Sequence, residues 1–544
     1  MARTLDTPRV ARVHRATDWP LRLVVFTGGA VSIGIELAAS RLLAPFFGTS
    51  LFIWATLIGL VLIYLSVGYI VGGKLADRYP DANVLYAITA IAAFVTGLIP
   101  LVSRPILAAS ITAFSAFSLG GFYGSLLGTI VLFAIPVTLL GCVSPYAIRL
   151  SVESLTGAGN TAGSLYALST VGSILGTFVP TFLLIPRIGT FRTFYSFAVV
   201  LLAVSAFGLI TIPVPGRRRG LVAVSLVLLG VTLLVASFGA SGFVRPVDDT
   251  HSLVYQGESA YNFIQVVQDA DSHAYELLLN EGHAIHSIYY PQEAATNQPL
   301  TRGPWDYFVL GPYFTPGART TSVHDVCFVG LAAGTGARRM TQAFGPNLQI
   351  DGVEIDPKIV EVGQRYFAMT EPNLHVIIED GRYYLKATTK RYDVVAVDAY
   401  KQPYIPFQLT TKEFFTEARD HLNPNGTLIV NAGRSATDYR LVEVISQTMR
   451  AVYPHVFTID TQNYTNTMVI GSLDPNATLA DFTRNINAEA LVNPNSPVVS
   501  VGNAALQYGK MAEVPPGPMV FTDDLAPVED LVDRIILDYA RNGK

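Results

Sequence analysis

The sequence predicts a multi-pass α-helical transmembrane domain followed by an α/β domain with a doubly wound, Rossmann-like sheet. The first observation is an uneven distribution of charge: residues 21–243 contain 15 charged side chains in 223 positions, and residues 244–544 contain 57 in 301. The second is that the charge-poor part is built from apolar runs of about 20 residues, enough to cross a hydrocarbon core about 30 Å thick. The third is a regular alternation of short β-branched runs with helical patterns after residue 324.

Seven apolar runs are long enough to be spans. They are predicted at 21–43, 51–73, 84–102, 122–142, 164–185, 191–212 and 221–241. Residues 1–20 form an N-terminal tail with four arginines and without the short apolar core and small-residue cleavage site of a signal peptide. Residues 104–121 are apolar, short and rich in serine, so both a re-entrant helix and an eighth span stay open.

Positive side chains place the N-terminal tail in the cytoplasm by the positive-inside rule. Seven spans then leave the C-terminal domain outside, whereas an eighth span brings it inside and puts Arg217–Arg219 on the wrong face. The charge pattern alone therefore does not decide the side of the membrane.

Glu36 is an acidic residue within the first predicted span, where a carboxylate is costly and is usually paired or functional. Arg41 is the nearest candidate partner, and both a structural ion pair and a functional role stay open. Gly172 and Gly176 form a G-x-x-x-G pattern, which favours close packing between helices.

Composition excludes several classes of protein. A net charge of −4 argues against a strongly basic nucleic-acid binder. The two cysteines, Cys142 and Cys327, fit neither a disulfide framework nor a C-x-x-C metal site, so we expect no metal ion.

The second half is predicted from its periodicity. Strands are expected at 325–329, 349–354, 374–378, 392–398 and 426–431, with two more near 456–460 and 467–471 at the sheet edge. Helices are expected at 337–344, 357–367, 410–422 and 438–453. Repeated βαβ units predict a parallel doubly wound sheet, in which a ligand binds at the carboxyl ends of the strands.

Polar or glycine-rich residues follow four of these strands. The first strand ends in a loop with Gly330, Gly334 and Gly336, which lets the backbone approach a ligand closely. The others end in carboxylates that can accept hydrogen bonds from ribose hydroxyls or an adenine amino group. These acids are Glu354, Asp356, Asp380 and Asp398, and Gly381, directly after Asp380, is a further candidate for nucleoside binding. Each acid alone is more often a helix N-cap, but their joint placement predicts a nucleoside site.

At these residues the chain resembles the spermidine synthase (polyamine aminopropyltransferase) family, and especially its membrane-fused members. The resemblance also includes residues 258–264, 277–282 and 522–529 and, in the membrane half, 166–191. It implies a class I methyltransferase-type domain (301–544) preceded by a small β-domain (250–300), after a transmembrane domain at 21–243.

The resemblance implies that decarboxylated S-adenosylmethionine is the co-substrate, with no tightly bound cofactor. It assigns ribose binding to Glu354, adenine binding to Asp380, and orientation or deprotonation of a polyamine acceptor to Asp398. It also places four residues in stretches expected to contact the substrate: Tyr261, Asn262, Tyr307 and Tyr400. The expected partners are a small polyamine, the lipid bilayer and, as in many members, a second copy of the chain. A cytosolic nucleoside favours a cytoplasmic C-terminal domain.

The acceptor half of the site departs from the family pattern. The glycine loop has Leu331-Ala332-Ala333 where soluble members have an aspartate, and Lys401 stands where they have a second aspartate. The acid-rich polyamine-binding stretch is also missing around residues 287–291 and 305–307. Two alternatives therefore stay open: a methyltransferase that uses S-adenosylmethionine itself, and a non-catalytic polyamine transporter or sensor with a nucleoside-binding domain.

Overall fold

The chain divides into two compact units, Met1–Arg245 and Pro246–Lys544. The computed structural model describes residues 18–47, 51–114, 120–152, 157–211, 218–239, 247–280, 284–401 and 404–542. Most of the predicted N-terminal tail (residues 1–17) and Arg217 lie outside the described residues.

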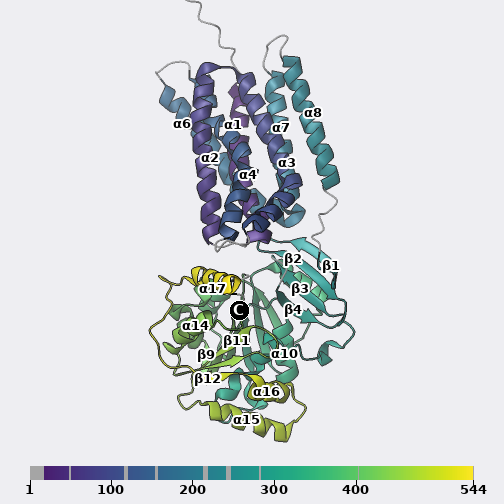
Figure 1. The fold of residues 1–544 in the computed structure, drawn as a ribbon, viewed down its shortest axis with the longest axis vertical. Coiled ribbons are helices and arrows are strands. Elements are labelled where there is room, and N and C mark those ends of the chain that lie inside the picture. The colour runs from purple at the N-terminus through teal and green to yellow at the C-terminus, as the bar shows by residue number, and fades with distance from the viewer. Residues whose placement is uncertain are drawn as a thin grey trace, which may run out of the picture. The chain divides into compact units, whose positions relative to one another are not determined.

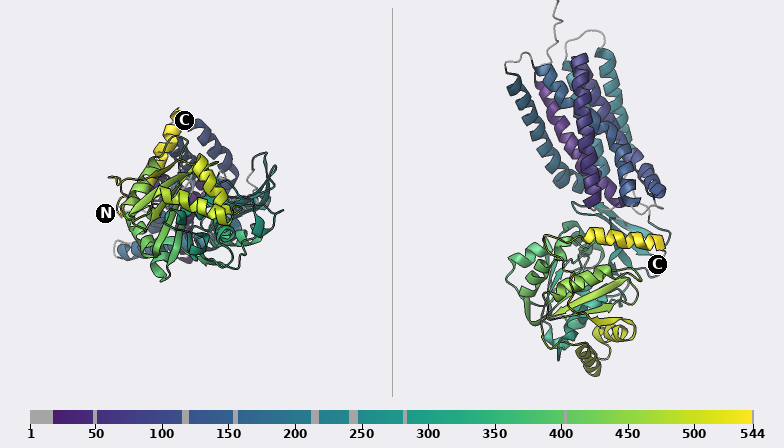
Figure 2. Two further views of the ribbon diagram at one scale, coloured as in Figure 1. Left: turned by 90° about the horizontal axis from the view of Figure 1, so that it is seen from below. Right: turned by 60° about the vertical axis from the view of Figure 1, so that its left-hand side comes forward.

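The first unit is helical. Its elements are α1 (Asp18–Phe47), α2 (Leu51–Arg78), α3 (Ala82–Phe114), α4 (Gly120–Gly141), α5 (Val143–Ser151), α6 (Ala158–Val179), the π-helical turn η1 (Pro180–Leu184), α7 (Ile185–Thr211) and α8 (Arg218–Gly239). The long helices lie side by side in a bundle (Figure 1, Figure 2). In the described part of the chain, five helical segments are long and apolar enough to cross a membrane, the last being Ala158–Thr211 with 54 residues.

The segment Ala158–Thr211 reverses direction within its length. Gly172 and Gly176 of α6 pack on the backbone of Phe26 and Ala30 of α1, so α6 runs parallel to α1. In α7, by contrast, Phe207 contacts Trp19 and Phe197 contacts Gly34, which makes α7 antiparallel to α1. Gly189, with φ 81° and ψ 168°, provides the break. The segment therefore forms two helices of opposite direction, at the positions of the two spans expected there.

Residues 104–114 are not a separate helix. They form the last three turns of α3, and 115–119 lie outside the described residues. A distinct span beginning at Arg104 is therefore not seen, because the helix continues through Pro100 and Pro105.

The second unit begins with a four-stranded antiparallel sheet. Its strands are β1 (His251–Glu258), β2 (Phe263–Asp269), β3 (Tyr275–Leu279) and β4 (Ile285–Tyr289). One face of this sheet packs on the helix α11 (Pro357–Tyr366) through buried residues such as Val266, Leu277 and Ile359.

An eight-stranded sheet follows, in the order β12-β10-β11-β9-β8-β5-β6-β7. Its strands are β5 (Asp325–Val329), β6 (Gln349–Glu354), β7 (Leu374–Ile378), β8 (Tyr392–Val397), β9 (Leu422–Gly433), β10 (His455–Asp460), β11 (Asn466–Ser472) and β12 (Met511–Glu513). Strands β5 to β9 are parallel, and β11, β10 and β12 are antiparallel to their neighbours.

Helices cover both faces of this sheet (Figure 2). One core layer contains α10 (Thr335–Phe344), α15 (Leu479–Val492) and α16 (Pro497–Tyr508). The other contains α12 (Gly381–Ala387), α13 (Lys412–Asp420), α14 (Arg440–Arg450) and α17 (Val528–Asn542). The predicted Rossmann-like α/β fold with a small β-domain is confirmed.

Candidate active site

The glycine loop joins β5 to α10 and lies against the end of β8. Gly330 has φ +90°, and a Cβ on it would lie 2.6 Å from the carbonyl oxygen of Asp398. A side chain at this position would therefore meet both backbone strain and a steric clash. Gly334, with φ +87°, is the N-cap of α10. Gly336 has a packing role, because a Cβ there would lie 2.8 Å from the ring of Phe328.

Glu354 ends β6 beside this loop and is only 8% exposed. Its Oε2 accepts a hydrogen bond from the backbone N–H of Ala332 at 2.8 Å, and its Oε1 accepts one from Asp356 at 3.1 Å. Burial raises the pKa of Glu354 to about 7, and these two hydrogen bonds oppose the rise. Each carboxylate oxygen retains an unused lone pair, so the side chain can accept further hydrogen bonds from hydroxyl groups.

Asp380 follows β7, the next strand along the edge. Its carboxylate accepts a hydrogen bond from the backbone N–H of Tyr383 at 2.9 Å and so caps α12. The side chain remains partly exposed. Gly381 brings α12 close to β5, since a Cβ there would collide with Val329.

Two apolar side chains at the same strand ends escaped the sequence analysis. Ile355 directly follows Glu354 and is 39% exposed, and Ile378 ends β7 and is 54% exposed. Exposed isoleucines beside polar strand ends suit the faces of a planar base. The signal available in the sequence is an apolar residue directly after Glu354 and another two residues before Asp380.

Asp398 follows β8, and its backbone N–H bonds to the carbonyl of Val329 at the end of β5. Its Oδ1 accepts a hydrogen bond from Asn431 at 2.9 Å, and Asn431 in turn accepts one from Asn466 at 2.9 Å. Burial raises the pKa of Asp398 to about 6, and the hydrogen bond from Asn431 opposes the rise. Among the described residues no group donates to Oδ2, so this oxygen can accept a proton.

Tyr400 supports the same strand end. Its hydroxyl donates to the backbone carbonyl of Asn431 at 3.0 Å. Burial and the nearby charge of Asp398 raise the pKa of Tyr400, so it remains a neutral phenol. Lys401 is exposed, and its backbone pairs with Tyr404.

The sheet order brings the predicted residues together. Strands β8, β5, β6 and β7 are consecutive neighbours, and their carboxyl ends lie at one edge. Backbone hydrogen bonds from Asp398 to Val329 and from Gly330 to Val353 join successive strand ends, and Glu379 bonds likewise to Glu354.

Asp356 lies deeper and ties elements together. It is fully buried and caps α11 by accepting from the backbone N–H of Lys358 at 2.9 Å. Its Oδ2 accepts from Ser259 at 2.5 Å and from Asn262 at 2.9 Å, both in the turn before β2. Asp356 and Asn262 thus join the small sheet to the larger domain, whereas Tyr261 is 44% exposed beside them.

Tyr307 belongs to the core. It is 2% exposed, and its hydroxyl accepts a hydrogen bond from the backbone N–H of Gln462 at 3.2 Å. The structure therefore does not group Tyr307 with the exposed residues at the strand ends, because its ring fills space beneath the β10–β11 turn.

With this geometry in hand, comparison with known proteins gives a consistent result. The Spermine/spermidine synthase domain profile matches residues 324–481. The chain is 32% identical to the "Probable polyamine aminopropyl transferase" of Bifidobacterium longum, over 53% of this chain and 65% of that protein. It is also 32% identical to the polyamine aminopropyltransferase of Pyrobaculum calidifontis, over 45% of this chain and 84% of that protein.

The chain belongs to the polyamine aminopropyltransferase family. This is a family of transferases. The match covers slightly less than two thirds of the Bifidobacterium longum protein. A polyamine aminopropyltransferase of Corynebacterium efficiens is 26% identical over 81% of this chain and 82% of that protein. Because the C-terminal unit is little more than half of the chain, that similarity includes part of the helical unit.

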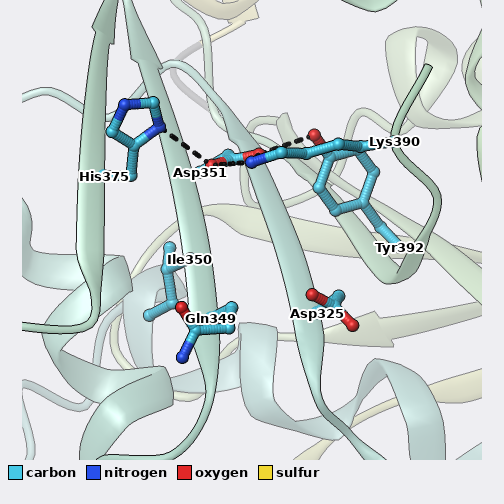
Figure 3. A pocket seen from close by; sticks show the side chains of 7 residues that line it. All are labelled: Asp325, Gln349, Ile350, Asp351, His375, Lys390 and Tyr392. Carbon is cyan, nitrogen blue, oxygen red and sulfur yellow. Dashed lines mark hydrogen bonds and ion pairs between the residues drawn. The ribbon is translucent and has the colours of Figure 1, made fainter. Parts of the chain in front are cut away.

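This polyamine aminopropyltransferase homologue also has a pocket of about 390 Å³ at the opposite, amino edge of the sheet (Figure 3). It is lined by Asp325, Gln349, Ile350, Asp351, His375, Lys390 and Tyr392. Asp351 accepts hydrogen bonds from Lys390 at 2.8 Å and from Tyr392 at 2.8 Å. These polar groups satisfy one another, which is typical of a structural cluster that holds strand ends together.

Proposed function

We propose that this chain is a membrane-bound aminopropyltransferase. It transfers an aminopropyl group from decarboxylated S-adenosylmethionine to an amine acceptor and releases methylthioadenosine. The observation that carries the proposal is the placement of Asp398, with one unoccupied carboxylate oxygen, at the sheet edge that also holds Glu354 and the glycine loop.

The nucleoside half of the site uses three strand ends. Glu354 accepts hydrogen bonds from the ribose hydroxyls, and the backbone of the glycine loop packs against the nucleoside. Asp380 accepts a hydrogen bond from the adenine amino group, and the exposed side chains of Ile355 and Ile378 contact the faces of the base.

The transfer is a displacement at carbon. The acceptor nitrogen uses its lone pair to form a bond to the methylene next to the sulfonium, and the carbon–sulfur bond breaks with its electron pair going to sulfur. The leaving group is a neutral thioether, so the protein mainly has to align the reactants and present a neutral amine. Asp398 takes the proton from the nitrogen, and a pKa of about 6 leaves it ionised at neutral pH.

The helical unit is proposed to lie in the membrane. Its lateral surface is apolar, with large side chains more than half exposed, among them Leu62, Ile70, Phe182 and Val227. Such a surface is unfavourable in water and matches a lipid environment. The nucleoside is a cytosolic metabolite, so the C-terminal unit is proposed to face the cytosol.

One observation favours a second candidate, an S-adenosylmethionine-dependent methyltransferase. The loop between Gly330 and Gly334 has Ala332 and Ala333 in place of an acid that would hold the aminopropyl ammonium group. A donor that keeps its carboxylate would not require that acid.

The test is to incubate the purified full-length protein with each sulfonium donor and a panel of amines, and to identify the nucleoside product by mass spectrometry. We expect methylthioadenosine, and we expect Asp398→Asn to reduce its formation by about 10²–10⁴-fold, the usual contribution of a general base. S-adenosylhomocysteine as the product would establish the methyltransferase. Nucleoside binding without turnover for any amine would contradict both enzymes and favour a sensor.

A further inference from the structure

The segment 522–529 near the C-terminus has no role in the proposed reaction, and it lies beyond residues 324–481, which the domain profile matches. The residue that leads into it, Phe521, is fixed on both sides of its backbone. Its N–H donates to the hydroxyl of Thr448 at 3.0 Å, and its carbonyl accepts from the N–H of Lys412 at 2.9 Å. Its ring is buried in the core layer that contains α13 and α14. The segment therefore starts from a fixed position on the C-terminal unit.

The carboxylate of Asp523, in this segment, binds the guanidinium group of Arg382. Arg382 is in the first turn of α12, two residues after Asp380, and is only 8% exposed. Its Nη1 and Nη2 each donate to one carboxylate oxygen of Asp523 at 2.7 Å. Asp523 also accepts a hydrogen bond from the hydroxyl of Thr411 at 2.7 Å, and its backbone N–H donates to Glu413 at 3.0 Å. The carboxylate is thus held in place on the side away from Arg382 as well.

Every N–H group of Arg382 has an acceptor. Its Nε and Nη2 donate to Glu417 of α13 at 2.7 and 2.8 Å, and its Nη1 donates to the carbonyl of Gln408 at 3.1 Å. Gln408 lies in the 3-10 turn η5 (Phe407–Leu409). A guanidinium group has five N–H donors in one plane, so with the two bonds to Asp523 all five are used. Arg382 therefore joins α12 to α13, to η5 and to the C-terminal segment.

Through α12 this network reaches the nucleoside site. The carboxylate of Asp380 caps the helix, and Gly381 packs against Val329 of β5. A helix of seven residues has little stability of its own, so contacts of its first turn decide where that turn lies. The side chain of Arg382 makes the most contacts in the turn. Its position therefore determines the position of the Asp380 carboxylate at the end of β7.

Asp523 is the second anion that Arg382 requires. Glu417 is shared, because the ammonium group of Lys386 also lies 3.3 Å from its carboxylate. The hydrogen bonds from Arg382 lower the pKa of Asp523, so this carboxyl group is ionised at neutral pH. A buried charge is stable only when its partners are complete. Without the Asp523 carboxylate, two N–H groups of Arg382 lose their acceptors, which favours a shift of the guanidinium group and of the turn that carries it.

We propose that Asp523 is a positioning residue for the nucleoside site and acts through Arg382 to hold the Asp380 turn in place for the adenine amino group. The inference rests on the proposed function, in which Asp380 is the adenine ligand. It makes the C-terminal segment a part of the binding site, although 141 residues separate Arg382 from Asp523 along the chain.

The test is calorimetric titration of the purified full-length protein with methylthioadenosine. Asp523→Asn presents one acceptor oxygen and one N–H₂ group to two N–H donors, so the guanidinium group loses a partner. Affinity should fall by about tenfold, within the range usual for a residue that acts on a ligand through another residue. Asp524→Asn, at the adjacent exposed position, is the matched control and should bind as tightly as the parent.

A double-mutant cycle separates positioning from a general effect on the fold. In Asp380→Asn the adenine ligand is already lost, while asparagine still caps α12. On that background, Asp523→Asn should weaken binding by less than about twofold, because both changes remove the same contact. On the background of Glu354→Gln, which alters the ribose contact on β6, the loss of about tenfold should remain. A lower thermal midpoint of Asp523→Asn does not reproduce this pattern.

The outcomes distinguish this inference from the proposed function. Unchanged affinity in Asp523→Asn, or a tenfold loss that persists on the Asp380→Asn background, overturns the positioning role and leaves the proposed function standing. A parent protein that does not bind methylthioadenosine contradicts the proposed function itself. Unchanged affinity in Asp380→Asn alone contradicts the adenine assignment and, with it, the role of Asp523.

Discussion

The carboxylate of Glu354 should make nucleoside affinity depend on pH. Ribose hydroxyls donate hydrogen bonds, which favour the ionised carboxylate, whereas the ligand-free side chain has a pKa of about 7. Binding below this pH must release a proton, so affinity should weaken by about tenfold per pH unit below about 7 and level off above it. Calorimetric titration with methylthioadenosine across this range checks the prediction.

Two variants sharpen this test. The Glu354→Gln variant should bind methylthioadenosine more weakly, because its amide N–H₂ group faces the backbone N–H donors of Ala332 and Asp356. Its affinity should no longer depend on pH, because an amide does not titrate in this range. Glu361→Gln, at an exposed position of α11 paired with Lys358, is the matched control and should behave as the parent. A pH-independent affinity in the parent protein would exclude Glu354 as the ribose ligand.

Asn431 should tune the acidity of Asp398. The side-chain amide of Asn431 donates a hydrogen bond to Asp398 and favours the ionised form of that carboxyl group. The Asn431→Ala variant should therefore raise the pKa of Asp398 beyond its value of about 6. The acid limb of the kcat/KM profile should then move to higher pH, by roughly one unit if the lost hydrogen bond contributes about 1.4 kcal/mol. Asn466→Ala acts only through Asn431 and should give a smaller shift in the same direction. An unmoved acid limb in both variants would contradict the assignment of Asp398 as the base.

At the scale of elements, Asp356 connects α11 to the small antiparallel sheet. Asp356→Ala removes the cap of α11 and leaves Ser259 and Asn262 without their acceptor. We expect a loss of about 2–4 kcal/mol of stability, the range for a broken buried network, and a lower thermal midpoint followed by Trp fluorescence. Asp380→Ala removes an exposed cap alone and should cost only about 1 kcal/mol. Equal losses of stability in the Asp356→Ala and Asp380→Ala variants would show that Asp356 does not connect α11 to the small antiparallel sheet.

The elements show which parts of this fold local sequence can determine. Strands β5, β6 and β7 have the predicted bounds, because buried parallel strands are short β-branched runs with turns on each side. The antiparallel order of β11, β10 and β12 was not predicted, since strand pairing depends on contacts distant in sequence. The helices α15 and α16 were missed for a similar reason, as their apolar faces are defined by the sheet they cover.

The candidate site divides in the same way. The acids at the strand ends can be found from sequence, because the apolar run that forms each strand also shows where the strand ends. The role of each side chain does not follow from its position alone. Gly336 and Gly381 are predicted as ligand contacts from the sequence, and the structure adds that each allows close packing against a buried side chain of β5. The family resemblance implies Tyr307, in the stretch 305–307, as a substrate contact, and burial places it in the core.

At the scale of the whole molecule, the two units have separate cores. The buried clusters of the helical unit contain only residues before 246, and those of the C-terminal unit contain only later residues. Apolar side chains cover the surface of the first unit, and charged residues are concentrated in the second. The two units therefore differ in the polarity of their surfaces.

Separate cores predict that residues 246–544 fold without the helical unit. All the strand ends of the nucleoside site belong to this segment, and its eight-stranded sheet is covered on both faces by its own helices. Expressed alone, it should be soluble and bind methylthioadenosine within about fivefold of the full-length affinity, a difference of about 1 kcal/mol. Calorimetry on both proteins checks this, with Glu354→Gln in the short form as the control for specific binding. If the segment aggregates, or folds and fails to bind, the nucleoside site requires the helical unit and the two parts form one functional structure.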